Sequence, residues 1–184
     1  MFFDQANALD TLKQKWVIRV LIQIGMPRGF ISFILATIAN VAAYVRCGPT
    51  TAFAFYVTAG LLQGDPLSAV LYVLCIEPLL LILRESVANC SIIRACADDI
   101  GLATSDIRVL RRIYKDFEDF RRIAGNRLKH RKCVIVALSA PLKQAILDIR
   151  AFLRNFVPEW ASFEVCLAGK YPGFVLGPNS GTVL

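Results

Sequence analysis

The sequence contains a single histidine, His130, and none of its six cysteines forms a Cys-x-x-Cys pair. Zinc sites are usually built from such pairs combined with histidines, so the sequence argues against a zinc site. A signal-peptide pattern is also lacking, which makes an oxidising compartment and a disulfide framework unexpected. We therefore interpret the cysteines as reduced, buried thiols of an intracellular protein.

Charged residues are scarce, at 19% of the chain, whereas hydrophobic residues make up 56%. With a mean hydropathy of +0.54, this composition excludes a disordered chain, and 184 residues are enough for one domain with a real core. So large an apolar excess in a short chain indicates surfaces that another segment or domain covers. We therefore expect the chain to be part of a larger protein.

The chain lacks an uninterrupted apolar run of the roughly 20 residues that a bilayer requires. Residues 30–45 form the best window, but this window is short and contains Ser, Thr and Asn. Residues 67–83 form a second window that includes Glu77 and Pro78, which are costly in lipid and ordinary in a soluble helix. We expect no membrane span, and a membrane protein is the third alternative, which fractionation would test.

Positive charge is in excess, with 21 Lys and Arg against 14 Asp and Glu and a net charge of +7. The excess is concentrated between Arg108 and Lys132. A basic balance of this kind is compatible with contacts to phosphates, although a solvated helix face explains most runs of charge.

The first third of the sequence predicts helices followed by a strand. Apolar residues recur at helical spacing over residues 9–24 and predict a helix that Gly25 ends. A second apolar helix is expected up to about residue 44, and residues 52–57 are typical of a strand.

The remaining elements alternate between helices and strands. Asp65 and Pro66 are typical of an N-cap and a first helical residue, and Pro78 is expected to kink or divide the helix that they begin. The later elements are predicted as two strands, a helix, a strand, a helix and a terminal hairpin, at residues 92–97, 100–104, 107–124, 133–138, 142–156 and 163–178. This order predicts a single α+β domain over residues 1–184, with helices packed on one face of a mixed sheet.

Two adjacent carboxylates, Asp98 and Asp99, interrupt an apolar stretch that reads CADDIGLA. Two like charges about 4 Å apart repel by roughly 4 kcal/mol at an effective dielectric of 20, so such a pair needs protons, cations or open water. A solvated hairpin turn is the simplest interpretation of an isolated Asp-Asp pair, since Asp is enriched in turns. The sequence around the Asp-Asp pair decides whether the pair is interpreted as a solvated turn or as a functional site.

Three stretches occur in an order that resembles the palm of reverse transcriptases from non-LTR retrotransposons. They read GLLQGDPLSAVLYVLCIEPL, CADDIGLA and GNRLKHRKC. Upstream, FFDQANALD is similar to the first palm motif of the family, and downstream, GKYPGFVLGP resembles its primer-grip hairpin, within residues 160–178. The pairing of QGDPLS with ADD about thirty residues later is the most specific part, because it combines a capped helix start with a carboxylate turn.

The resemblance implies a partial palm-like fold, an antiparallel or mixed sheet without fingers and thumb, and an RNA-directed DNA polymerase. In that family the carboxylates corresponding to Asp4, Asp98 and Asp99 hold two Mg²⁺ or Mn²⁺ ions. Two ions about 3.5 to 4 Å apart stabilise the attacking 3′-hydroxyl oxygen and the leaving oxygen of nucleotidyl transfer. The implied partners are an RNA template, a DNA primer, a dNTP and the fingers and thumb segments of a longer polyprotein.

The same resemblance assigns nucleotide-binding residues, and the basic helix adds candidates for binding nucleic acid. Its nucleotide-binding residues correspond to Leu9, Gln63, Gly64 and Lys132. A loop amide competes with this interpretation at the glutamine, and a surface lysine competes with it at the lysine. Basic residues of the predicted helix after the turn are expected to contact nucleic acid, namely Arg111, Arg112, Arg121 and Arg122.

The sequence departs from the family pattern at four positions. Cys96 replaces the usual aromatic residue before ADD, and Leu9 stands where the family has the Phe that excludes a 2′-hydroxyl. Asn7 replaces a common Lys, and Pro172 interrupts the usual Tyr-Leu-Gly. These departures keep open the alternative of a non-catalytic retroelement remnant with weak nucleic-acid binding. We expect these 184 residues alone to be inactive, and a working element to be located in the nucleus.

Overall fold

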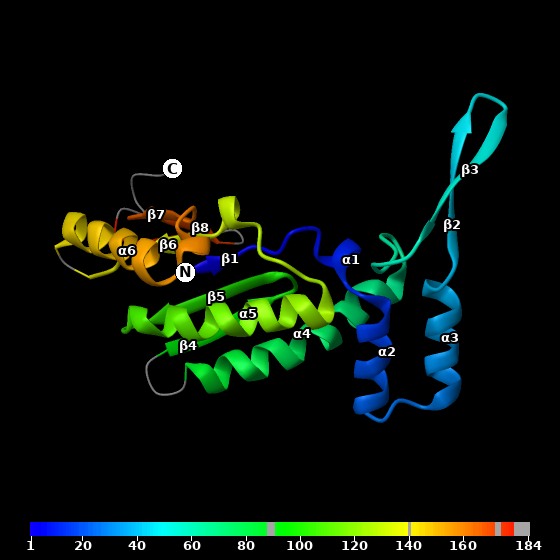
Figure 1. Ribbon diagram of the computed structural model, residues 1–184, viewed down its shortest axis with the longest axis horizontal. Coiled ribbons are helices and arrows are strands. Elements are labelled where there is room, and N and C mark those ends of the chain that lie inside the picture. The colour runs from blue at the N-terminus through cyan, green and yellow to red at the C-terminus, as the bar shows by residue number, and fades with distance from the viewer. Residues whose placement is uncertain (88–90, 140, 172–173, 179–184) are drawn as a thin grey trace. The chain divides into compact units, whose positions relative to one another are not determined.

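The computed structural model describes residues 1–87, 91–139, 141–171 and 174–178 (Figure 1). The chain divides into two compact units. The first, which we call the sheet unit, comprises Met1–Ala6, Leu79–Asp119 and Arg127–Leu184. The second, the helix–hairpin unit, comprises Asn7–Pro78 and Phe120–Asn126. That the whole chain forms a single domain stays a prediction.

The sheet unit contains a five-stranded sheet with the strand order β4-β5-β1-β6-β7. All neighbours in this sheet are antiparallel except β6 and β7, which pair in parallel. A separate antiparallel hairpin, β8–β9, follows it. The predicted mixed sheet is therefore confirmed, with strands at Phe2–Phe3 (β1), Ser91–Cys96 (β4), Asp99–Thr104 (β5), Val134–Val136 (β6), Glu164–Cys166 (β7), Gly169–Tyr171 (β8) and Phe174–Leu176 (β9).

Two long amphipathic helices, α5 (Leu110–Ala124) and α6 (Leu142–Phe156), accompany the strands. Helix α5 buries an apolar face and exposes its arginines, because its apolar residues recur at helical spacing. Short 3-10 helices lie before α5, before β6 and after α6, at Ile107–Val109 (η1), His130–Lys132 (η2) and Pro158–Trp160 (η3). The predicted α+β class is thus confirmed.

The core of the sheet unit is an aromatic cluster around Phe3, which is 2% exposed. Its ring lies 5.1 Å from that of Phe117, 5.6 Å from Trp160 and 6.2 Å from Phe163, measured between ring centroids. Tyr114 contacts Trp160 from the side at 5.5 Å. Strand β1, α5 and the segment after α6 therefore share one buried cluster.

The helix–hairpin unit consists of helices α1 to α3, the hairpin of β2 and β3, the first part of α4 and the last part of α5. The hairpin stands clear of α2 and α3 of its own unit in Figure 1. The elements are Ala8–Thr11 (α1), Gln14–Gln23 (α2), Arg28–Ile38 (α3), Val41–Cys47 (β2), Thr50–Val57 (β3) and Pro66–Ser86 (α4), of which α4 continues into the sheet unit.

The single helix predicted over residues 9–24 is wrong, because the chain leaves the helix at Leu12 and starts a new one at Gln14. Backbone groups of distant segments compete for the hydrogen bonds of this turn. The N–H of Lys13 donates to the carbonyl of Ala124 at 2.7 Å, and the N–H of Gly60 donates to the carbonyl of Leu12 at 2.8 Å. These bonds replace the helical ones that residues 12 and 13 would otherwise make.

The second predicted helix also ends earlier than expected, at Ile38 rather than near residue 44. Asn40 adopts a positive φ of 58°, a conformation that Asn tolerates better than most residues. The chain then turns into β2, which starts at Val41. An apolar run of this length does not by itself distinguish a helix from a helix followed by a strand.

Helix α4 runs through Pro78 without being divided, contrary to one outcome predicted from the sequence. The indole N–H of Trp16 donates to the carbonyl of Cys75 at 3.0 Å, in the turn where the proline disturbs the helical hydrogen bonds. Among the described residues α4 is long and apolar enough to cross a membrane, and 44% of its most apolar window is buried. Core helices meet the same criterion, so the absence of a membrane span stays a prediction.

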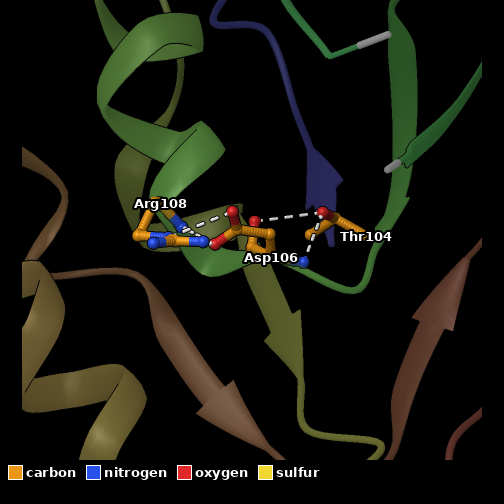
Figure 2. A network of polar contacts seen from close by, with 3 residues as sticks. All are labelled: Thr104, Asp106 and Arg108. Atoms are coloured by element: carbon orange, nitrogen blue, oxygen red, sulfur yellow. Dashed lines mark hydrogen bonds and ion pairs between the residues drawn. The ribbon is translucent and has the colours of Figure 1, made fainter. Parts of the chain in front are cut away.

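A small polar network joins the end of β5 to η1 (Figure 2). The Thr104 hydroxyl accepts from the Asp106 N–H and donates to the Asp106 carbonyl, both at 3.0 Å. The Asp106 carboxylate caps η1 by accepting from the N–H of Arg108 at 2.9 Å, and the Nε of the same arginine donates to it at 2.9 Å. These hydrogen bonds hold the pKa of Asp106 below its usual range.

We expect Asp106→Ala to lower the urea midpoint of unfolding at pH 7. Because folding lowers this pKa, the carboxylate stabilises the fold above about pH 3.9, its value in the unfolded chain, and this contribution is lost as the pH falls further. Parallel urea titrations at pH 7 and pH 3 should show a larger deficit at pH 7 than at pH 3. At pH 7, the urea midpoint of Asp106→Asn, which keeps a cap acceptor without the charge, should lie between those of the parent and of Asp106→Ala. An equal deficit at both pH values would contradict the assignment.

Candidate active site

The turn between β4 and β5 presents the Asp-Asp pair at the end of the sheet. Cys96 pairs with Asp99, which leaves Ala97 and Asp98 as the two turn residues. The sequence placed both aspartates in the turn, whereas Asp99 is the first residue of β5. Ala97 has a φ of 53°, a conformation that costs a non-glycine residue roughly 1 kcal/mol. The half-buried Asp98 and Asp99 therefore lie side by side at a strained turn.

Strand β1 brings Asp4 to the same edge of the sheet. Phe3 pairs with Ile100 in antiparallel register, so Asp4, which follows Phe3, lies next to Asp99, which precedes Ile100. The carbonyl of Asp4 accepts from the N–H of Lys129 at 2.8 Å, which fixes the backbone beyond the strand. Two residues more than 90 positions apart in sequence thus meet through the pairing of β1 with β5.

The electrostatics of this edge reflect the crowding of the carboxylates. The pKa of Asp99 is raised, first by burial and then by the negative charges of Asp98 and Asp4, while Lys132 opposes the shift. The Nζ of Lys132, from η2, lies 3.9 Å from Oδ2 of Asp4. Side chains from three elements therefore act on one another here, and the sum of their charges is negative.

The described residues contain no group of three His, Cys, Asp or Glu side chains close enough to hold a metal ion as they stand. That Asp4, Asp98 and Asp99 lie close enough to one another to bind shared metal ions stays a prediction. The kind of donor suits Mg²⁺ and Mn²⁺, since carboxylate oxygens are the ligands that these hard cations prefer. The half-buried, mutually repelling carboxylates are also a site at which a cation lowers the energy.

The predicted nucleotide-binding residues other than Lys132 lie in the helix–hairpin unit. The amide of Gln63 donates to both carboxylate oxygens of Asp10, at 3.0 and 3.2 Å. Asp10 closes the first motif, but its sequence context predicted no role for it. Leu9 is half-buried and its carbonyl accepts from the N–H of Leu61 at 2.9 Å, so α1 and the Gln63 segment are linked.

Gly60 permits this link, since it has a φ of 87° and a Cβ there would lie 2.7 Å from the carbonyl oxygen of Asp10. Gly64, with a φ of 90°, is exposed and has open space around it. Asp65 caps α4, as predicted, because its carboxylate accepts from the N–H of Leu67 at 2.8 Å.

The four predicted nucleic-acid-binding arginines are exposed on α5, in two pairs. The guanidinium of Arg111 lies 5.4 Å from the ring centroid of Phe156, and Arg112 contributes to the lowered pKa of Asp106. Arg121 and Arg122 come from the end of α5 that belongs to the helix–hairpin unit. Of the primer-grip hairpin predicted within residues 160–178, β8 and β9 pair as a hairpin, whereas β7 pairs in parallel with β6; Pro172 is outside the described residues.

This α+β fold, with an Asp-Asp turn beside an aspartate from a neighbouring strand, is palm-like. The sequence matches the family described as "Reverse transcriptase (RNA-dependent DNA polymerase)" over residues 1–176. The chain belongs to the reverse transcriptase family.

Curated relatives come from retrotransposable elements. The chain is 29% identical over 142 residues to the "Retrovirus-related Pol polyprotein from type-1 retrotransposable element R2" of Popillia japonica, covering 73% of this chain and 23% of the relative. It is 26% identical over 159 residues to the polyprotein from "type-2 retrotransposable element R2DM" of Drosophila melanogaster, covering 81% of this chain and 15% of the relative. The resemblance to non-LTR reverse transcriptases is thus confirmed, and the chain spans less than a quarter of these relatives.

Among solved structures, the chain resembles one titled "Structure of apo telomerase from Candida Tropicalis truncated from C-terminal domain", with a TM-score of 0.60. The match has 15% sequence identity and covers 71% of this chain and 29% of the telomerase chain. At this identity the likeness supports the fold alone.

Cys133 provides a test of how β1 is held. Its Sγ lies 3.8 Å from the carbonyl oxygen of Asp4, it is fully buried, and burial raises its pKa to about 12. We expect native N-ethylmaleimide labelling at pH 7.5 to spare Cys133, since the thiolate is the reactive form. Phe3→Ala, which removes the core side chain beside Asp4, should expose Cys133 to rapid labelling.

The buried Cys75 and the exposed Cys47, both in the helix–hairpin unit, are the internal controls. Cys75 should stay protected in Phe3→Ala, which would separate local release of β1 from global unfolding, and Cys47 should react at an unchanged rate. Continued protection of Cys133 in the variant would show that Phe3 does not hold this segment.

Proposed function

We propose that these residues form the palm of an RNA-directed DNA polymerase of a non-LTR retroelement, which adds nucleotides to a primer 3′-hydroxyl. The observation that supports this most is the position of Asp4 beside the Asp98–Asp99 turn, on strands that only the fold brings together. An isolated solvated turn would not require a third carboxylate next to it. The proposed substrates are an RNA template, a DNA primer and a dNTP.

Asp4, Asp98 and Asp99 are the proposed ligands of two Mg²⁺ or Mn²⁺ ions. When bound, such ions stabilise negative charge on the attacking and leaving oxygens of the displacement. The chain's own contribution is to hold three oxygen-donor side chains at one edge, where burial and repulsion raise the pKa of Asp99. A cation relieves this repulsion, so the mutual repulsion of the carboxylates favours its binding.

Lys132 and Gln63 are proposed to bind the incoming nucleotide in different ways. Lys132 is 58% exposed at its side chain and lies within 3.9 Å of Asp4, which suits a point charge beside a departing pyrophosphate. Gln63 is held by Asp10 in one orientation, with Gly64 leaving open space for close backbone approach. Leu9 is proposed to contact the sugar, where a side chain smaller than Phe leaves more room for a 2′-hydroxyl.

The exposed arginines of α5 are proposed to neutralise phosphates of the template and primer: Arg111, Arg112, Arg121 and Arg122. These contacts need no assembled active site. The remainder of the polymerase, including fingers and thumb, is proposed to come from other segments of a polyprotein like those of the relatives, and a working element is proposed to act in the nucleus.

Mn²⁺ binding tests the carboxylate site without requiring activity. We expect titration of the 184-residue chain, followed by the electron paramagnetic resonance signal of free Mn²⁺, to show a site that the double variant Asp98→Asn, Asp99→Asn weakens at least tenfold, about 1.4 kcal/mol. Asp148→Asn, which removes an exposed carboxylate from α6, is the matched control and should bind Mn²⁺ like the parent. Equal binding by the parent and the double variant would remove the metal assignment.

Primer extension on an RNA template tests whether these residues suffice for catalysis. We expect the 184-residue chain to give no measurable extension with Mg²⁺, because misplacing the 3′-hydroxyl by about 1 Å costs on the order of a hundredfold and the relatives use far more chain. Binding of the labelled template should persist and fall steeply with salt. If the parent extends the primer and the double variant Asp98→Ala, Asp99→Ala does not, the chain is catalytic by itself, and the expectation that it is inactive alone is wrong.

A further inference from the structure

The β2–β3 hairpin is exposed on both faces within its own unit. Its strands pair from Val41 with Val57 to Cys47 with Thr50, and every side chain from Tyr44 to Tyr56 is exposed. Figure 1 shows the hairpin extending beyond the helices of the helix–hairpin unit. An isolated two-stranded hairpin is at best marginally stable in water, so a surface of this kind is expected to be covered by something when the protein works.

Three aromatic rings gather on one face of this hairpin. Tyr44 and Phe53 pair across the strands with ring centroids 5.9 Å apart, and Phe53 lies 5.0 Å from Tyr56. A bulge between Ala43 and Tyr44 shifts the register, so that Tyr56 joins the same face although it is three residues from Phe53. All three rings are more than half exposed, at 62%, 51% and 61%. We call them the aromatic face.

The stretch of sequence that contains the aromatic face has basic residues and no acidic ones. Arg46, two residues after Tyr44 in an unbroken stretch of β2, belongs to the same face. No Asp or Glu occurs from residue 11 to residue 64. The charged residues of this segment are all basic: Lys13, Lys15, Arg19, Arg28 and Arg46.

We propose that the aromatic face binds unpaired bases of single-stranded RNA, by stacking them on Tyr44, Phe53 and Tyr56 while Arg46 contacts the phosphates. Aromatic side chains and a guanidinium on an exposed sheet are the combination that stacks and neutralises single strands. The absence of acidic residues from the surrounding segment removes the main repulsion that phosphates would meet. RNA is chosen over DNA because this inference rests on the proposed function, in which the unpaired strand is an RNA template.

The other face of the hairpin contrasts with the aromatic face. It carries one aromatic ring, Phe55, paired to Ala43, and otherwise mainly small or aliphatic side chains such as the pair of Val45 and Ala52. No charged residue lies on that face, because Arg46 is the only charged residue of β2 and β3. Stacking and phosphate contacts therefore coincide on one face.

The test is fluorescence anisotropy with the 184-residue chain and a 5′-fluorescein-labelled dodecamer of uridines, which is unpaired. Phe53→Leu keeps an apolar side chain of similar volume and removes the ring, and we expect it to weaken binding about tenfold or more. Tyr56→Phe keeps the ring and should bind like the parent. Phe33→Leu removes an equally exposed ring, 53% exposed on α3, and should also bind like the parent.

Salt and the nucleic acid separate this face from the arginines of α5. The ratio of the dissociation constants of Phe53→Leu and the parent should be the same at low and at moderate salt, since stacking carries no charge. The absolute affinities of both proteins should fall as the salt concentration rises. A DNA dodecamer of thymidines and a blunt RNA duplex should bind more weakly than the single-stranded RNA. The Asp98→Asn, Asp99→Asn variant should keep full RNA affinity, so failure of the metal site and failure of the hairpin are distinguishable.

Parental affinity in Phe53→Leu, with unchanged circular dichroism and melting temperature, would overturn the proposal. Equal or tighter binding of the DNA dodecamer or of the duplex would overturn single-stranded RNA as the occupant. A dimer that sedimentation velocity detects in the parent and not in Phe53→Leu would show that a second copy covers the aromatic face, and would overturn it as well.

Discussion

The position of the candidate active site depends on the burial of Phe3. Strand β1 is only two residues long, although flanking backbone bonds, from the N–H of Leu102 to the carbonyl of Met1 and from the N–H of Lys129 to the carbonyl of Asp4, extend its pairing. The ring of Phe3 contacts Phe117, Trp160 and Phe163, and burying such a side chain contributes about 1.5 to 3 kcal/mol. Because Asp4 is the next residue, the packing of this ring, together with the backbone bond between Asp4 and Lys129, fixes where the first carboxylate lies.

The same edge of the sheet combines strain with a stable foundation. Repulsion among carboxylates and the positive φ of Ala97 both destabilise the chain locally. Directly behind them, Ile100 is fully buried and Leu102 is 3% exposed, so β5 is firmly anchored where its first residue carries charge. Local destabilisation that a neighbouring core offsets is typical of sites that bind a ligand or an ion.

The two units present candidate binding sites of different chemistry. The sheet unit holds several carboxylates at the ends of neighbouring strands, and their combined negative charge attracts cations. The helix–hairpin unit contains a long segment without acidic residues that carries exposed aromatic rings, which suits nucleic acid. A polymerase needs both kinds of surface, because its metal ions bind carboxylates while its template and primer bring phosphates and bases.

The sequence by itself determined the α+β class, the family, the helix at residues 142–156 and the cap at Asp65, since each depends on neighbours within a few positions or on a short motif. Only the tertiary structure decided the break of the first helix at Leu12, because backbone groups from distant segments supply the deciding hydrogen bonds. It also decided the course of α4 through Pro78, and that Asp4 lies beside Asp99. Periodicity reports which face of an element is buried, whereas strand pairing between residues 4 and 99 depends on a core that forms only when the whole unit folds.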